Sequence, residues 1–578
     1  MNDASQKQAA QELMRHSMAH ILAMAIIRLY PNTKIGIGPA IENGFYYEVD
    51  APIKLTMKDL PKIEAEMRKI IAEELPFKQI IIPKEQAFDT LMQSGQIFKT
   101  ELLRQIPDES VSFFKTGDFY DLCRGPHLAH TGQAGFFKLT RISSSHWLGE
   151  KNRPKLQRIE GVAFNQEQDL LTYLESQKEI IQKDYRKIGR RLNLITFDDD
   201  IGNNLMIWLP KGDIIREELK KFLFDKLSKL GIIKLSTPSL AKFTLYRDYF
   251  EDSKVRDQYL ALIKTNRNEY LFRNDSFFHH AVVFKSTKKS YRQMPQRYAE
   301  YFDLYKQNPA EAPMDIEYSQ TLQTNIFCRA DQVEEEIGTL LGLTRQLLQF
   351  IGVNDFQILV KLSDPKLKST KENNPKNMLK LLEKTLAKQK LAAKIVASDY
   401  YNNGAEIGFY VKDLLGNLLK ISTIRIDNTS ASKEELYYIN NDNLKEIPVV
   451  IRFNFVESFE AMLKIMLEKN EGIFDVWLAP VQCVIIAISE KFHEQALNIQ
   501  KQLLNVGLRA SVNLEPETMQ NKIRRAENEN IPYMLILGEK EVNTNSVSLR
   551  QRTGQELGLI RIEEFIDRIK DEISQKAF

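Results

Sequence analysis

Cysteine is scarce in this sequence, and the spacing of the few cysteines excludes two common structural roles. The 578 residues include only three, Cys123, Cys328 and Cys483, and these lie far apart. A disulfide framework needs several paired cysteines, and a compact metal motif needs two of them a few residues apart. The chain has neither pattern, so we expect it in a reducing compartment, the cytoplasm.

Long hydrophobic runs and a strong excess of charge are missing as well. No stretch reaches the roughly 20 apolar residues that cross a bilayer. The polar, glutamine-rich start of the chain lacks the apolar centre of a signal peptide. We therefore expect no membrane partner. The net charge is only +3, so a nucleic-acid-binding surface must be local rather than spread over the whole protein.

The remaining composition is that of an ordinary globular protein, and its pattern predicts several domains of α+β and α/β type. Residues 11–29 have helical apolar spacing, and Asn43-Gly44 separates two strand-like segments, which predicts a hairpin. After residue 472, short apolar strands alternate with helices, which predicts a mostly parallel sheet covered on both faces. The predicted segments are a first domain at 1–165, a linker helix at 166–192, a mixed domain at 193–472 and a last domain at 473–578.

Two pairs of metal-binding or catalytic side chains stand out. His16 and His20 are four residues apart on the predicted first helix and therefore share one face. Cys123 and His127 repeat that spacing of four. If the pairs converge, they offer either ligands for Zn²⁺ or a site in which histidine activates water. Either pair alone is more often incidental than functional.

The sequence around both pairs resembles the editing domain of bacterial threonyl-tRNA synthetases. The matching stretches are RHSMAH at 15–20, GIGPAIENGFYY at 36–47, DLCRGPH at 121–127 and LQRIEGVAF at 156–164. The resemblance implies that His16, His20, Cys123 and His127 form the pocket, supported by Asp121 and Lys99. It implies hydrolysis of serine wrongly attached to threonine tRNA. Alanyl-tRNA editing domains of this pattern bind zinc, whereas the threonyl versions work without it, so we expect no metal and no other cofactor for hydrolysis.

The physical need for such a reaction is clear. Serine and threonine differ by one methyl group, which a binding pocket discriminates by only about 1–3 kcal/mol. A second, hydrolytic pocket can exclude threonine by a steric clash. In it a positioned water attacks the aminoacyl ester, while polar groups stabilise the developing oxyanion.

The resemblance continues into a class II synthetase core with an antiparallel sheet, but here it departs from the family at the sites of activation. The matching stretches are DYRKIGRRLNL at 184–194, WLPKGDIIR at 208–216 and SYRQMPQRYAE at 290–300. In the family, one cysteine and two histidines hold the zinc that binds threonine; the corresponding residues here are Phe277, Asn325 and Arg452. The ATP-contacting arginines of motifs 2 and 3 become Lys306 and Ala461. Lysine keeps the charge but not the two-pronged hydrogen bonding of arginine. We therefore predict that threonine activation is lost or weak.

The last domain resembles the anticodon-binding domain of the family through WLAPVQ at 477–482 and IPYML at 531–535. The resemblance implies that Lys522, Arg524, Glu541 and Arg550 face tRNA, and it implies threonine tRNA as the partner. It also implies a homodimer through the class II core. The family's usual small domain ahead of the editing domain has no counterpart in this sequence.

Three functions follow from these observations. The leading hypothesis is a hydrolase that removes serine from mischarged threonine tRNA. The alternative is a threonine–tRNA ligase with a diverged active site, which would need ATP, Mg²⁺ and Zn²⁺. A second alternative is a non-catalytic tRNA-binding paralogue.

Overall fold

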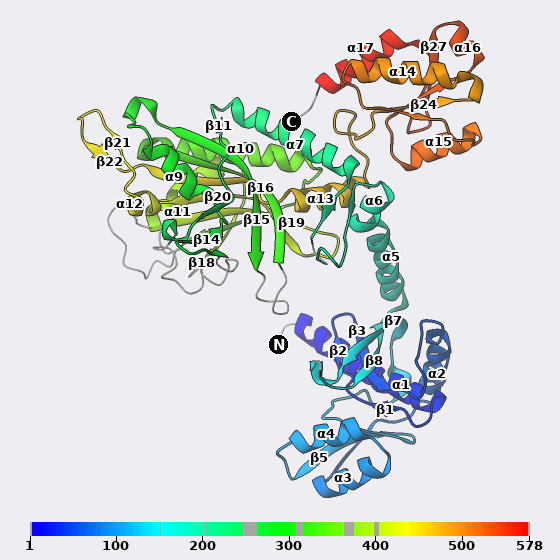
Figure 1. Ribbon diagram of the computed structural model, residues 1–578. Coiled ribbons are helices and arrows are strands. Elements are labelled where there is room, and N and C mark those ends of the chain that lie inside the picture. The colour runs from blue at the N-terminus through cyan, green and yellow to red at the C-terminus, as the bar shows by residue number, and fades with distance from the viewer. Residues whose placement is uncertain are drawn as a thin grey trace. The chain divides into compact units, whose positions relative to one another are not determined.

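The computed structural model describes residues 3–150, 152–202, 205–246, 263–307, 316–362, 375–397 and 404–575. The chain divides into two compact units, Met1–Glu179 and Ile180–Phe578, which are drawn in Figure 1. This division lies inside the predicted linker, and the predicted domain ends at 165, 192 and 472 remain predictions. None of the helices in the described ranges combines the length and apolar character needed to cross a membrane.

The first unit is built on one long helix packed on an antiparallel sheet. The helix, α1 (Asp3–Leu29), contains the predicted helical segment and begins earlier. Its apolar face, with Met18 and Leu22 fully buried, shares a core with the sheet and with helix α2 (Leu60–Ala72). The sheet has the order β1-β3-β8-β7, with β2 paired to β3. Its strands are β1 (Lys34–Ile35), β2 (Ala40–Ile41), β3 (Gly44–Asp50), β7 (Phe136–His146) and β8 (Lys155–Phe164).

The predicted hairpin is present, but its first strand is interrupted. The turn is at Asn43, whose φ of 62° is the left-handed conformation that asparagine tolerates well. The chain between β1 and β2 passes very close to Tyr47 of β3, since a side-chain carbon added at Gly38 would lie 2.2 Å from the Tyr47 ring. This close passage breaks the first strand into two short ones, and it fixes the Tyr47 ring in place.

A smaller sheet, β4-β5-β6, completes the first unit. Helices α3 and α4 pack on it, and the loop that carries Cys123 and His127 leaves its last strand. The elements are β4 (Lys78–Pro83), α3 (Lys84–Gln93), α4 (Ile97–Gln105), β5 (Ser110–Thr116) and β6 (Phe119–Leu122).

The prediction of a single linker helix is wrong in one respect, because the segment forms two helices, α5 (Glu167–Lys183) and α6 (Tyr185–Arg191). Asp184 between them has an extended backbone, and its carboxylate accepts a hydrogen bond from the Arg186 N–H. Aspartate in this position caps the start of a new helix, so α5 ends here and α6 begins.

The larger part of the second unit is an eight-stranded sheet in the order β11-β15-β16-β23-β20-β19-β17-β18. The six central strands, from β15 to β17, are antiparallel to one another. The two edge strands are parallel to the strands beside them, β11 to β15 and β18 to β17. Helices α7, α10 and α13 share its apolar core. The predicted antiparallel class II sheet is therefore confirmed.

The bounds of these elements are as follows. The strands are β11 (Ile233–Lys234), β15 (Gln296–Gln307), β16 (Ile316–Cys328), β17 (Gln357–Leu362), β18 (Lys394–Ala397), β19 (Gly404–Lys412), β20 (Leu418–Asp427) and β23 (Val449–Val456). The helices are α7 (Pro210–Ser228), α9 (Phe277–Lys285), α10 (Val333–Phe350), α11 (Pro375–Lys388), α12 (Ser430–Lys433) and α13 (Phe459–Asn470). Short strands at the edges are β9 (Ile195–Thr196), β10 (Ile207–Trp208), β12 (Leu240–Lys242), β13 (Ile263–Lys264), β14 (Glu269–Phe272), β21 (Tyr438–Ile439) and β22 (Lys445–Glu446).

The C-terminal part is a five-stranded sheet, β25-β24-β26-β27-β28. Alternate residues of β24 enter two apolar cores on its opposite faces, so the prediction of a sheet covered on both sides is confirmed. The prediction of a mostly parallel sheet holds for the first three strands, whereas β27 and β28 are antiparallel. The elements are β24 (Cys483–Ala487), α14 (His493–Asn505), β25 (Ala510–Asn513), α15 (Met519–Asn528), β26 (Tyr533–Leu537), α16 (Glu539–Asn543), β27 (Ser546–Gln551), β28 (Glu556–Arg561) and α17 (Ile562–Ser574).

Candidate functional site

The two predicted side-chain pairs meet in the first unit. His16 and His20 project from one face of α1, and Cys123 and His127 come from the loop after β6. One donor atom from each of the four residues lies within 4.8 Å of the others. We call these four residues the quartet. The Cys123 Sγ lies 3.3 Å from His16 Nε2 and 3.4 Å from His127 Nε2.

A glycine shapes the loop that carries the second pair. Gly125 has a φ of 66°, and a side-chain carbon there would lie 2.6 Å from the Phe114 ring. Its backbone N–H donates to the Cys123 Sγ at 3.3 Å. Glycine therefore lets the loop fold back so that Cys123 and His127 face the helix.

A hydroxyl group sets the orientation of His127. The Ser17 hydroxyl donates to the Leu13 carbonyl oxygen and lies 3.3 Å from His127 Nδ1. Because the Ser17 hydroxyl already donates its hydrogen to that carbonyl, its oxygen can only accept from His127. We therefore assign the Nδ1–H of His127 as the donor. The lone pair of His127 Nε2 then faces Cys123. Ser17 lies inside the motif at residues 15–20, but no feature of that motif distinguishes it as a site residue.

Asp121 is the buried anchor beneath the quartet. Its Oδ1 forms an ion pair with Lys99 Nζ at 2.6 Å, its Oδ2 accepts a hydrogen bond from the Tyr47 hydroxyl at 2.5 Å, and His20 Nε2 lies 3.5 Å from Oδ2. Lys99 and Asp121 are only 4% and 1% exposed, so the ion pair is shielded from water. The two predicted supporting residues thus lie beside the quartet.

Tyr47 is a site residue that the sequence analysis did not select. It belongs to the quoted motif at residues 36–47, and on β3 it alternates inward with Phe45 and Val49. A buried tyrosine usually finds a hydrogen-bond partner for its hydroxyl. That tendency was the feature by which Tyr47 could have been selected from the sequence. Burial and the Asp121 carboxylate raise the pKa of Tyr47 well above its usual value, so the hydroxyl stays protonated and donates.

Burial keeps the quartet neutral. It lowers the pKa of His16 and, more strongly, that of His20. Burial and the two neighbouring imidazoles lower the pKa of His127 to about 2, and burial raises the pKa of the Cys123 thiol to about 11. At neutral pH the site therefore holds neutral imidazoles and an undissociated thiol. A thiolate nucleophile is not favoured here.

The same pKa shift predicts a loss of stability in acid. His127 is neutral in the folded protein down to about pH 2, whereas an unfolded histidine takes up a proton near pH 6.5. The unfolded state therefore binds more protons below about pH 6.5, and the free energy of unfolding falls by about 1.4 kcal/mol per pH unit for each such histidine. Urea unfolding at several pH values checks this. The variant His127→Gln is expected to have a smaller slope, and an unchanged slope would contradict the assignment.

Three residues of the quartet, His16, His20 and Cys123, line a cavity large enough for a substrate. Its volume is about 650 Å³, within the range of pockets that hold small ligands. Its walls include Lys99, Asp121, Tyr47 and two further residues of α1, Glu12 and Leu13. Three imidazoles and a thiol are also a suitable donor set for Zn²⁺. The expectation of a metal-free site remains a prediction.

The three positions that the resemblance assigns to the zinc of the class II core also come together. Asn325 on β16 lies directly opposite Arg452 on β23. The Arg452 guanidinium carbon lies 4.2 Å from the centre of the Phe277 ring. Within the described part of the chain, the quartet is the only group of His, Cys, Asp and Glu side chains arranged to hold a metal.

The two positions assigned to ATP contacts are less informative. Ala461 lies in the first turn of α13, where its N–H donates to the capping Ser458 hydroxyl. Lys306 lies near the end of β15, and its side chain is outside the described part of the structure.

The predicted tRNA-facing residues of the last domain differ in their surroundings. Lys522 is buried and donates to the carbonyl oxygens of Ala487 and Asn513. Glu541 accepts from Gly538 N–H and Ser548 Oγ, and Arg550 pairs with Glu527 and Glu556. Arg524 is exposed on α15. Their role in tRNA binding stays a prediction, and Arg524 is the best placed of the four to meet a partner.

Two protein families match parts of this chain. Residues 482–572 match a family described as the anticodon binding domain. Residues 111–160 match the second additional domain of threonyl and alanyl tRNA synthetases. The second match includes Asp121, Cys123 and His127.

Curated relatives match nearly the whole chain. The threonine–tRNA ligase of Halalkalibacterium halodurans is 34% identical over 576 residues, which is 97% of this chain and 89% of the relative. That of Geobacillus kaustophilus is 34% identical over 98% of this chain and 88% of its own. That of Thermus thermophilus is 33% identical over 96% of this chain and 88% of its own.

A solved structure agrees with this. The RNA binding domain of threonyl-tRNA synthetase from Cryptosporidium parvum has a TM-score of 0.62 and 25% sequence identity, covering 67% of this chain and 98% of that one. The predicted architecture, with an editing-type domain, a class II core and an anticodon-binding domain, is thereby confirmed. The chain belongs to the threonyl-tRNA synthetase family.

Proposed function

We propose that this protein hydrolyses the ester of mischarged aminoacyl-tRNA at the quartet, with serine on threonine tRNA as the substrate. The observation that carries the proposal is the convergence of His16, His20, Cys123 and His127 on one another, with His16, His20 and Cys123 lining a cavity. The buried Lys99–Asp121 ion pair beneath them fixes the geometry. The anticodon-binding domain supports tRNA as the partner that delivers the ester. A homodimer through the class II core belongs to the same proposal.

The chemistry follows from the protonation states. A water in the cavity gives a proton to a neutral imidazole as its oxygen adds to the ester carbonyl carbon. The Lys99 ammonium, on the cavity wall, favours the developing negative charge on the carbonyl oxygen. The bond from that carbon to the ribose oxygen then breaks. The ribose oxygen takes the proton back from the imidazolium, and free serine and uncharged tRNA leave.

A second candidate is threonine–tRNA ligation, which the comparisons favour over hydrolysis. All three relatives named above are threonine–tRNA ligases and match at least 96% of this chain. Ligation needs ATP and Mg²⁺, and in the family it uses the zinc whose positions here are Phe277, Asn325 and Arg452. The side chains present at those positions do not favour this candidate.

One pair of assays on the purified protein separates the two functions. We expect rapid release of serine from serine-charged threonine tRNA, and threonine-dependent ATP–pyrophosphate exchange at background level, because activation residues are replaced while the quartet is whole. Exchange well above background, with slow serine release, would establish the ligase instead. Failure of both activities, with tRNA still bound, would leave the non-catalytic tRNA-binding function.

A further inference from the structure

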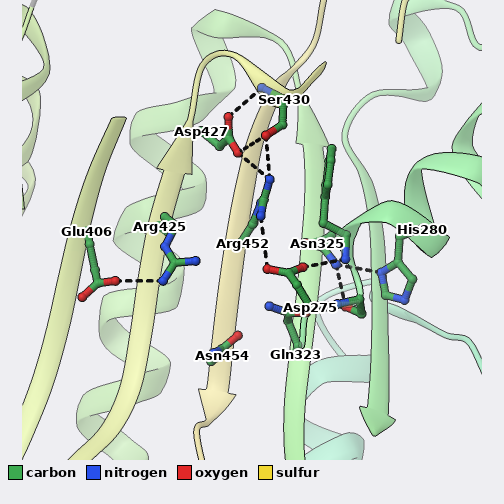
Figure 2. A network of polar contacts seen from close by, with 12 residues as sticks. Asp275, His280, Gln323, Asn325, Glu406, Arg425, Asp427, Ser430, Arg452 and Asn454 are labelled. Carbon is green, nitrogen blue, oxygen red and sulfur yellow. Dashed lines mark hydrogen bonds and ion pairs between the residues drawn. The ribbon is translucent and has the colours of Figure 1, made fainter. Parts of the chain in front are cut away.

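A polar row crosses the central sheet of the class II core. Asn325, Arg452, Arg425 and Glu406 lie opposite one another on β16, β23, β20 and β19. Figure 2 shows these four side chains on the strands, with the Glu406–Arg425 pair separate from the contacts that surround Arg452. Neighbouring residues on the same strands, such as Ile326 and Ile451, belong to the apolar core on the other face.

Two positive charges are adjacent in this row. Arg452 and Arg425 are direct cross-strand neighbours, and like charges so placed destabilise a sheet unless acids offset them. Arg425 pairs with the fully buried Glu406 at 2.9 Å, and Lys420 reaches the same carboxylate at 3.0 Å. Arg425 therefore has an acidic partner, although it shares Glu406 with Lys420 and Lys361. The partners of Arg452 are different.

Arg452 is held by two acids from outside the row. Its Nη1 donates to Asp275 at 3.1 Å, and its Nη2 donates to Asp427 at 2.5 Å and to the Ser430 hydroxyl at 2.7 Å. Its guanidinium also lies over the Phe277 ring, a favourable cation–π position. Asp427 in turn accepts from the backbone N–H groups of Thr429 and Ser430. One guanidinium thus ties β23 to the segment before α9 and to the start of α12.

This arrangement does not fit a zinc ion. A ring replaces the thiolate at Phe277. The Asn325 amide nitrogen donates to Ser276 Oγ at 2.8 Å and lies 2.9 Å from His280 Nδ1. The carboxylates of Asp275 and Asp427 would be acceptable zinc ligands, but both are paired with Arg452. A divalent cation beside that guanidinium would also be repelled.

We propose that the Arg452 guanidinium supplies the positive charge at the former zinc positions of the class II core, and that it replaces a metal ion in holding the surrounding segments together. The class II core then needs no zinc to fold. A guanidinium has no exchangeable coordination position, so the core cannot bind an amino acid through a metal. This inference does not depend on hydrolysis at the quartet, because it concerns a different unit of the chain.

The first test measures bound zinc. The double variant His20→Ala/Cys123→Ala disables the quartet, so that any zinc it retains belongs elsewhere. After dialysis against zinc and then buffer, elemental analysis is expected to find well under one zinc per chain. Stoichiometric zinc in this variant would overturn the proposal. A deacylase assay is not involved, so failure of the proposed function leaves this result readable.

The second test measures what the guanidinium does. Removing one partner of a buried ion pair is strongly destabilising, so Arg452→Met is expected to lower the thermal midpoint of the core by roughly 5 °C or more. Arg452→Lys keeps the charge and is expected to lose less. A chelator is expected to leave the midpoint of the unmodified protein unchanged. A midpoint for Arg452→Met within about 1 °C of the parent would overturn the proposal.

Discussion

Replacing His20 by alanine is expected to slow serine release from mischarged threonine tRNA by at least about 100-fold, the usual contribution of a positioned acid or base. His20 is buried, burial keeps its imidazole neutral, and Asp121 lies 3.5 Å from its Nε2. Its Nδ1 is buried and has no hydrogen-bond partner among the described residues, and the residue lines the cavity. Single-turnover hydrolysis with radiolabelled serine on the tRNA measures the effect.

A matched control comes from the same unit. His146 at the end of β7 has its Nδ1 3.0 Å from the Arg153 carbonyl oxygen and is not among the residues lining the cavity. His146→Ala should therefore hydrolyse within about threefold of the parent rate, since this half-buried residue lies outside the cavity and the change removes no group from it. Equal losses in both variants would mean that folding, not chemistry, is affected. An unchanged rate for His20→Ala would remove His20 from the mechanism.

The two candidate functions depend on residues in different units of the chain. Hydrolysis uses the quartet, where every residue type implied by the family motif is present and in contact. Ligation uses the class II sheet, where Arg452 pairs with Asp275 and Asp427. Similarity over the whole chain shows descent and fold, but a relative's name does not test the residues at one site. The exchange assay decides because it reports on those residues directly.

Much of the candidate site was predictable because its residues lie in two short motifs. The spacing of four puts His16 and His20 on one helix face, and resemblance joined them to Cys123 and His127. Tyr47 and Ser17 could not be selected in this way. Their roles depend on which neighbour accepts or donates a hydrogen bond, and that is settled only when α1, β3 and the loop after β6 are packed together.

The fold shows the same limit. Periodicity predicted α1, the turn at Asn43 and the first three strands of the C-terminal sheet. It did not predict the break at Asp184, because the charges on both sides continue a helical pattern and one capping aspartate interrupts it. It also did not predict the antiparallel pairing of β27 with β28, because strand direction depends on how the chain returns to the sheet rather than on side-chain alternation. In the class II core, resemblance assigned the zinc positions to Phe277, Asn325 and Arg452. It did not identify the two acids whose carboxylates pair with Arg452.

Replacing Lys99 by methionine is expected to destabilise the first unit by about 3–5 kcal/mol, the cost of leaving one buried charge without its partner. The Asp121 carboxylate, which is 1% exposed, would keep the Tyr47 hydroxyl as a donor but lose the Lys99 ammonium. Hydrogen exchange of the α1 amides reports the opening of this unit within the intact chain. Faster exchange in α1, with the second unit unchanged, is the expected result.

Two further variants show whether the buried pair is the cause. Lys69→Met removes a lysine that is 70% exposed and paired with Glu66, and it should cost less than about 1 kcal/mol. The double variant Lys99→Met/Asp121→Asn removes both buried charges while leaving an oxygen that can accept from Tyr47. It should recover at least half of the loss, because no unpaired charge remains buried. If it is as unstable as Lys99→Met, the loss comes from packing of the lysine stem, and the Lys99–Asp121 pair then serves the chemistry of the site rather than its stability.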